Sequence, residues 1–260
     1  MAPTRHVDWP SAWRIISTRY PPIDLFERVS PNPTIWEALI AAEQRVNPRV
    51  RDEIGQIALV APEERISGPG ASYVMASFTH LNPKGSRFSD GGFGVYYAAR
   101  ALETAIAETV HHFERFAEDS ADPPRSEDMR VIVGAVKAPL VDVGALPGPE
   151  RASLLDPDAY GAAQAFARTQ REAGEKGLVY PSVRHPGGEC IGASPPASFR
   201  RPGRNATCNT GGTANGWTNI TTTSAKTEFR DRAPHPKSVS TTGTTTPAAR
   251  RPISSFFSLL

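Results

Sequence analysis

The clearest pattern in this chain is a run of apolar positions at helical spacing between Arg100 and Glu118. Intervals of three and four residues put such positions on one face of an α-helix, so an amphipathic helix is predicted here with its apolar face toward a core. Glu108 stands almost opposite that face. The predicted core stripe consists of Leu102, Ile106, Val110, Phe113 and Ala117.

Shorter patterns predict the remaining elements. Apolar runs predict strands at 13–16, 94–98, 129–136 and 178–180, a strand or turn at 24–29, and a strand or helical turn at 73–78. Helices are expected at 35–46 after the cap Thr34, at 50–57, and from Asp156-Pro157 to Arg171 with Gly174 at the end. Because strands and helices are mixed without regular alternation, we predict an α+β fold and not a doubly wound sheet.

Composition divides the chain into two parts. The apolar fraction of 39% is low for a compact fold, and the shortfall lies after Ala193, where Thr, Ser, Pro, Gly and Arg dominate. We therefore expect a globular domain over 1–193 and a disordered tail over 194–260.

The tail contains a second pattern. Reading the codons of 206–221 from their third base, with GC-rich codon choice, can give HLQYRWDGQRVDQYYD, in which aromatic and polar residues alternate as in a β-hairpin. We hypothesise that the tail is a frameshifted reading of the native C-terminus, beginning near Ala193. The last strands of the domain would then be missing and a sheet edge exposed.

Charge and cysteine content exclude several classes of function. The formal net charge is only +2, so direct nucleic-acid binding is not expected. No stretch has membrane-spanning length or the pattern of a targeting signal, and we expect a cytoplasmic location without membrane attachment. Cys190 and Cys208 lack metal-ligand spacing, and a metal site built from His185, Glu189 and Cys190 is disfavoured, so no metal is expected.

Candidate chemistry begins on a glycine-rich loop. Arg87 lies between Gly85 and the pair Gly91-Gly92, where the backbone can approach a ligand and a guanidinium can bind phosphate. A solvent-exposed loop arginine is the alternative. Tyr96 and Tyr97 alternate on the strand that follows, so one ring faces the core and the other is available to a cleft. The pattern leaves open which ring does which.

Glu108 and Ser182 are the other candidates. Glu108 is either an ordinary surface glutamate or a carboxylate over a cleft, where it would bind a ribose hydroxyl or offset positive charge on a sugar ring. Ser182 follows Tyr180-Pro181 and is not surrounded by a nucleophile-elbow motif. Because the nearby His185 is poorly spaced for a Ser–His pair, we interpret Ser182 as a ligand contact and not as a nucleophile.

Five elements in order resemble the RES domain, a family named for an arginine, a glutamate and a serine. The resemblance spans roughly Trp13 to Ala193, and the order of the elements makes it specific although each is weak alone. The elements are Phe26-Glu-Arg28, Gly85-Ser-Arg87-Phe88, Gly94-Val-Tyr-Tyr-Ala98, Ala105-Ile-Ala-Glu108 and Tyr180-Pro-Ser182.

This resemblance implies an ADP-ribosyltransferase-like fold and a toxin of a bacterial toxin–antitoxin pair. Such toxins consume NAD by phosphorolysis, hydrolysis or ADP-ribosyl transfer. The implied partners are NAD as substrate, inorganic phosphate where the reaction is phosphorolysis, and a cognate helix-turn-helix antitoxin.

The resemblance also implies roles for individual residues. Arg28 and Arg87 would hold the diphosphate of NAD. A long insertion separates them in this chain, which leaves Arg14 or Arg19 as substitutes for Arg28.

Near the scissile bond, Tyr97 or Tyr96 would pack on nicotinamide or ribose, by the same resemblance. Glu108 would support an oxocarbenium-like transition state, and Ser182 would hydrogen-bond nicotinamide or ribose.

An NAD-consuming toxin is therefore the first functional hypothesis. An inactive remnant or a non-catalytic interaction module is the alternative, favoured by the unusual tail. A hydrolase using Ser182 ranks last, because only a serine and a nearby histidine support it.

Overall fold

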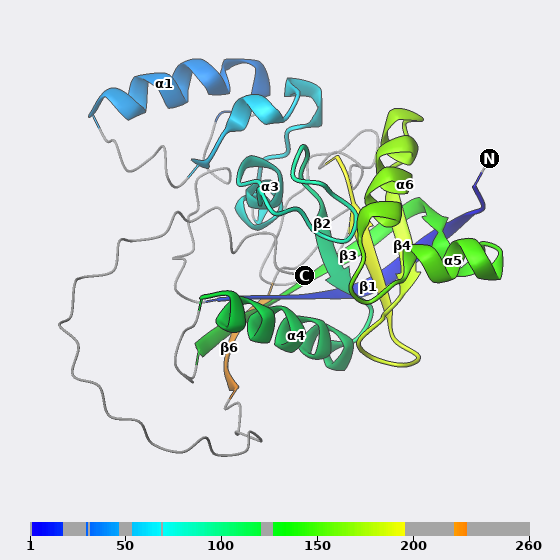
Figure 1. Ribbon diagram of the computed structural model, residues 1–260. Helices are drawn as coiled ribbons and strands as arrows, with labels where there is room; N and C mark the ends of the chain where they lie inside the picture. The colour runs from blue at the N-terminus through cyan, green and yellow to red at the C-terminus, as the bar shows by residue number, and fades with distance from the viewer. Residues whose placement is uncertain are drawn as a thin grey trace.

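The computed structural model describes residues 2–17, 30, 32–46, 54–68, 70–120, 127–195 and 221–227. These residues form helices and strands in mixed order, which confirms the α+β class (Figure 1). The strands are β1 (Thr4–Ser17), β2 (Tyr96–Ala99), β3 (Glu127–Asp142), β4 (Gly177–Pro181), β5 (Glu189–Ala193) and β6 (Thr221–Thr227). The helices are α1 (Trp36–Val46), α3 (Ala71–Thr79), α4 (Leu102–Ser120), α5 (Gly148–Leu154) and α6 (Gly161–Glu172).

The strands form one sheet in the order β1-β2-β5-β4-β3-β6, and β1 also pairs with β3. This extra pairing is antiparallel and long, from Thr4 opposite Val141 to Ser17 opposite Met129. Strands β1, β2, β5, β4 and β3 therefore close into a ring, and β6 adds to β3 outside it. Only the short contact between β3 and β4 is parallel among the described strand pairs.

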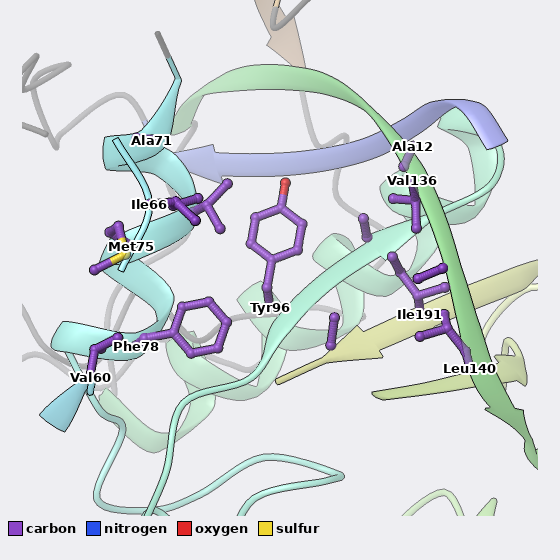
Figure 2. Close-up of a cluster of buried hydrophobic side chains, with 14 of the residues drawn as sticks. Ala12, Val60, Ile66, Ala71, Met75, Phe78, Tyr96, Val136, Leu140 and Ile191 are labelled. Atoms are coloured by element: carbon purple, nitrogen blue, oxygen red, sulfur yellow. The ribbon is translucent and has the colours of Figure 1, made fainter. Parts of the chain in front are cut away.

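Alternation along the strands separates two apolar clusters. On β2, Tyr96 and Ala98 join a cluster with α1 and α3, whereas Tyr97 and Ala99 join a cluster with α4 and α6. Figure 1 shows α1 and α3 above the strands and α4 below them. In Figure 2 the Tyr96 ring lies between side chains of α3 and side chains of the strands. The two faces of β2 thus belong to different parts of the molecule.

Several sequence predictions agree with these elements. The strands predicted at 13–16, 94–98, 129–136 and 178–180 correspond to β1, β2, β3 and β4, and the helices predicted at 35–46 and 100–118 correspond to α1 and α4. The segment 73–78 is helical, within α3. A short 3-10 helix, Pro33–Ile35, precedes α1, and its N-cap is Asn32, whose side chain accepts from the backbone N–H of Thr34.

Other predictions differ from the structure. The helix expected from Asp156-Pro157 begins only at Gly161, because the Asp156 carboxylate accepts from the backbone N–H groups of Asp158 and Ala159 and so caps a turn. Helix α5 and strand β5 were not predicted. The segment 24–29 and most of 50–57 lie outside the described residues.

From the predicted tail the structure describes Ser194, Pro195 and strand β6. Strand β6 pairs antiparallel with the first part of β3, from Thr227 opposite Glu127 to Thr221 opposite Val133. The threonines of this strand favour extended backbone.

Candidate functional site

Helix α4 turns Glu108 inward. Glu108 is only 9% exposed, whereas Ile106 of the predicted core stripe is 38% exposed. The buried face carries Thr104, Ala105 and Thr109 beside Glu108. The predicted stripe was therefore wrong at Ile106, because small and polar residues, not large apolar ones, let this helix approach the strands at the site. The interpretation of Glu108 as a solvated surface residue is also wrong.

Glu108 and Ser182 are hydrogen-bonded to each other. The Ser182 hydroxyl, at the end of β4, donates to Glu108 Oε1 at 2.6 Å. The Ser182 hydroxyl oxygen itself accepts from the backbone N–H groups of Arg184 at 3.2 Å and His185 at 2.9 Å. Its proton is therefore directed at the carboxylate, while the turn after β4 fixes its position. A charge-assisted bond of this kind orients the carboxylate strongly.

His185 is not positioned as a general base for Ser182. The Nδ1 atom of its ring pairs with the Thr104 hydroxyl at 2.8 Å, and it is the backbone N–H of His185 that reaches Ser182. The serine lacks the imidazole contact that nucleophilic activation requires. This geometry argues against a nucleophilic serine, and the role of Ser182 as a ligand contact stays a prediction.

The two tyrosines have separate environments. The Tyr97 hydroxyl pairs with the Ser86 hydroxyl at 2.8 Å and accepts from the backbone N–H of Phe88 at 3.0 Å, so it fastens the glycine-rich loop to β2. Tyr96 is buried in the cluster on the opposite face of β2. Burial raises the pKa of each phenol to about 12. Tyr97 is thus the tyrosine on the side of Glu108 and Arg87.

Arg87 is also held inside the protein. It is 9% exposed, and its Nη1 atom donates to the carbonyl oxygen of Asp156 at 2.6 Å and to that of Leu154 at 3.4 Å. Its guanidinium carbon lies 4.6 Å from the centre of the Tyr160 ring. The alternative of a solvated loop arginine is therefore wrong. The loop itself turns tightly at Gly85, where φ is +73° and a Cβ would lie 2.4 Å from the Ser89 carbonyl oxygen.

The charges of Arg87 and Glu108 shift the pKa values of the same two buried groups, the Cys190 thiol and the Tyr180 phenol. The pKa of the Cys190 thiol is raised, first by burial and then by the Glu108 charge, while Arg87 opposes the rise. The pKa of the Tyr180 phenol is raised by burial, and the charges of Glu108 and Arg87 again act on it in opposite directions. Both ionic side chains therefore lie near one weakly hydrated region, where their fields are less screened than in water.

Further basic residues surround this region, and the sequence analysis did not assign them. Burial lowers the pKa of His112 to about 3, and His111, Arg184, Arg115 and Arg87 lower it further. The pKa of His111 is lowered by burial and by the same three arginines. In the sequence, helical spacing already places four polar residues on one face of this helix: Glu108, His111, His112 and Arg115.

Of the three candidates for the early arginine of the family pattern, Arg14 alone lies within the described residues. Arg28 and Arg19 lie outside the described part of the chain. Arg14 is buried on β1, where it donates to the Tyr97 carbonyl at 2.9 Å and lies over the Tyr96 ring at 4.8 Å. It therefore has a structural position between β1 and β2.

The described residues contain neither a metal cluster nor a membrane-spanning helix. No group of three or more His, Cys, Asp or Glu side chains in this part of the chain is arranged to hold a metal ion. Likewise, none of the helices described here combines the length and apolar character that crossing a bilayer requires.

Comparison with known proteins gives one family. The RES domain model matches residues 62–208, which include Arg87, Tyr97, Glu108 and Ser182. The uncharacterized protein y4oC of Sinorhizobium fredii (strain NBRC 101917 / NGR234) is 30% identical over 130 residues, which are 50% of this chain and 55% of that protein. The chain thus spans little more than half the length of this relative.

A solved structure is also similar in part. It is the M.tuberculosis MbcT-MbcA toxin-antitoxin complex, with a TM-score of 0.38 and 13% identity over 55% of this chain and 73% of that chain. The family match covers more than half of the present chain and contains the residues that the fold brings together. The chain therefore belongs to the RES domain family.

Proposed function

We propose that this protein is a RES-type toxin that cleaves NAD at the bond between nicotinamide and ribose. The observation that supports this most is the buried Ser182–Glu108 hydrogen bond of 2.6 Å inside a RES domain. A carboxylate held in this way is suited to stabilising positive charge that develops on a sugar ring. Glu108 and Arg87 are the catalytic candidates, and Tyr97 and Ser182 are candidates for NAD contact.

In the proposed reaction, the bond between ribose C1′ and the pyridinium nitrogen breaks. Its electron pair goes to the nitrogen, so nicotinamide leaves as a neutral molecule and the ribose becomes oxocarbenium-like. The Glu108 carboxylate offsets this charge, while Ser182 fixes the carboxylate's orientation. An acceptor oxygen from phosphate, water or a protein side chain then attacks C1′ and loses its proton.

The remaining assignments belong to the same proposal. Arg87 would bind the diphosphate, joined by Arg28 from outside the described residues. Tyr96 would contribute through the core behind β2 and not through contact with NAD, because its ring lies in the cluster with α1 and α3, whereas Tyr97 lies in the cluster with α4. The proposal includes an ADP-ribosyltransferase-like fold, action in the cytoplasm, no metal, and a cognate helix-turn-helix antitoxin as partner.

An inactive remnant or interaction module is the competing proposal, and one experiment separates the two. Purified protein is incubated with NAD, with and without phosphate, and nicotinamide and the ribosyl product are identified by mass. We expect nicotinamide release to fall by about 100-fold or more in Glu108→Gln, the scale for removing one preorganised electrostatic group.

Glu103→Gln is the matched control, because Glu103 is an exposed glutamate on the same helix. We expect its activity to stay within about twofold of the parent, as is usual for surface substitutions. If the parent chain and a version with the restored reading frame both leave NAD intact, the proposal is wrong and the competing one stands.

A further inference from the structure

Three arginines from different parts of the chain converge on the loop between α5 and α6. Arg87 donates to the carbonyl oxygens of Leu154 and Asp156. Arg184, from the turn after β4, donates to the Pro157 carbonyl oxygen at 2.5 Å. Arg115, from α4, lies over the ring of the same Tyr160 that Arg87 contacts, at 6.0 Å.

These guanidiniums are not neutralised by ion pairs within the described residues. The ion pairs found there involve Arg5, Arg65, Arg100, Lys137 and Arg168 instead. Asp156 is committed to capping its own turn through backbone N–H groups. Asp158 is exposed, and its charge is felt at His111. The three guanidiniums therefore lie near the carboxylates of Glu108, Asp156 and Asp158 without forming an ion pair with them within the described residues.

The three side chains also keep unused donors. A guanidinium carries five N–H groups. Arg184 uses one of them on Pro157, and Arg115 makes only its ring contact among the residues described. Guanidiniums that are held by carbonyl and ring contacts, and keep N–H groups free, form a preorganised fork for oxyanions.

The cluster continues from the Ser182–Glu108 pair. The backbone N–H of Arg184 donates to Ser182 Oγ, so this arginine is attached directly to the pair. Arg115 follows Glu108 by two helical turns, about 10 Å along the axis, and helical side chains lean back toward the N-terminus. A ligand with a sugar at Glu108 would therefore place its next groups along the arginines.

We propose that Arg115 and Arg184, together with Arg87, bind phosphoryl oxyanions beside the proposed ribose position. The position of the ribose at Glu108, and so the direction in which the substrate extends, rests on the proposed function. The ligand chemistry has two sources: the diphosphate bridge of a dinucleotide, or free inorganic phosphate delivered to C1′. Three guanidiniums offer enough N–H donors for the two charged phosphoryl groups of a diphosphate bridge. His111 and His112 line the same region as uncharged groups.

Ligand binding to the full chain tests this without turnover. ADP, inorganic phosphate and nicotinamide riboside, which lacks phosphate, are titrated by calorimetry into the parent protein and into Arg115→Gln, Arg184→Gln and the double variant. We expect each single change to weaken ADP binding at least tenfold and the double change more, with binding of the riboside unchanged. Arg45→Gln, at an exposed arginine of α1, is the matched control for charge and should bind ADP like the parent.

The two sources give different results. A diphosphate site binds ADP at least tenfold more tightly than inorganic phosphate, whereas a site for free phosphate binds the two alike. Equal ADP and phosphate binding by the parent and the double variant, or no binding to either protein, overturns the proposal. Arg115 is exposed, so its variant keeps the test valid if Arg184→Gln fails to fold.

The outcomes also separate this inference from the proposed function. Arginine-dependent ADP binding without NAD cleavage leaves the oxyanion site standing and removes the reaction. NAD cleavage with unchanged ADP affinity and unchanged KM in the double variant leaves the reaction standing and removes the site.

Discussion

Ser182 contributes to the site through position and not through nucleophilic reactivity. Its hydroxyl donates to Glu108 and accepts from two backbone N–H groups of the following turn. Removing the hydroxyl would leave the buried carboxylate with one donor fewer and free to reorient. Since hydrogen bonds to charged groups contribute about 1.5–3 kcal/mol, the loss corresponds to roughly one to two powers of ten in rate.

For Ser182→Ala we therefore expect kcat for nicotinamide release to fall by about 10- to 100-fold. Ser182→Thr, which keeps a hydroxyl, should recover much of it. Steady-state kinetics with NAD measure both, and Ser153→Ala, at an exposed serine of α5, serves as control. If Ser182→Thr is as slow as Ser182→Ala although both are folded, the positioning role is wrong.

Sequence reasoning at this scale identified the residues that local motifs carry. Glu108, Arg87 and Ser182 were selected from short patterns, and the fold buries all three. Arg115 and Tyr160 were missed, because their proximity to the site depends on how the loop between α5 and α6 lies against α4. Helical spacing places Arg115 on the same face as Glu108, but the loop that packs against this face is set by tertiary structure.

Helix α4 carries a titrating group with a measurable effect on stability. Burial, with the positive charges of Arg184, Arg115 and Arg87, lowers the pKa of His112 from 6.5 to about 3 in the folded protein. Between these values the unfolded chain binds a proton that the folded chain does not. The contribution to stability is therefore complete above pH 6.5 and is lost progressively as the pH falls toward 3.

We expect the free energy of unfolding of the parent protein to fall between pH 7 and pH 5, and His112→Gln to reduce that fall by on the order of 1 kcal/mol. Urea unfolding at the two pH values measures it. The exposed His6 on β1 provides the control His6→Gln. A pH dependence identical in parent and His112→Gln would contradict a buried, neutral imidazole.

At the scale of elements, strong periodicity predicted that a helix forms better than it predicted which face of the helix is buried. The α4 helix was predicted, but its buried face only in part: Phe113 of the predicted stripe is buried, whereas Ile106 is exposed and Ala105 and Thr109 are buried instead. Helix α5 begins at Gly148-Pro149, a pair that resembles a turn, although proline is favourable at the first position of a helix. Strand β5 follows Gly187-Gly188 and has only short alternation, so it needed its neighbours β2 and β4 to be recognised.

At the scale of the whole molecule, the first part of β3 is a place where another strand can add to the closed ring. Strand β3 pairs with β1 along most of its length and with β4 only near Asp142, so its first part is open on the other side. Strand β6 pairs with this part. Its sequence, Thr-Thr-Thr-Ser-Ala-Lys-Thr, has no large apolar residue, and a strand without an apolar face specifies its register weakly.

The frameshift hypothesis predicts that a better partner for this edge is encoded in the alternative frame. A tail containing HLQYRWDGQRVDQYYD alternates aromatic and polar residues, and each favourable cross-strand pair contributes about 0.2–1 kcal/mol. We therefore expect the restored-frame protein to unfold at a Tm higher by a few degrees than the chain with the present tail. Differential scanning calorimetry measures it, with a scrambled version of the same peptide as control. Because a scrambled tail keeps composition but loses alternation, equal Tm values for restored and scrambled proteins would mean that the edge of β3 does not recognise the pattern. Resequencing that confirms a single intact frame would remove the hypothesis itself.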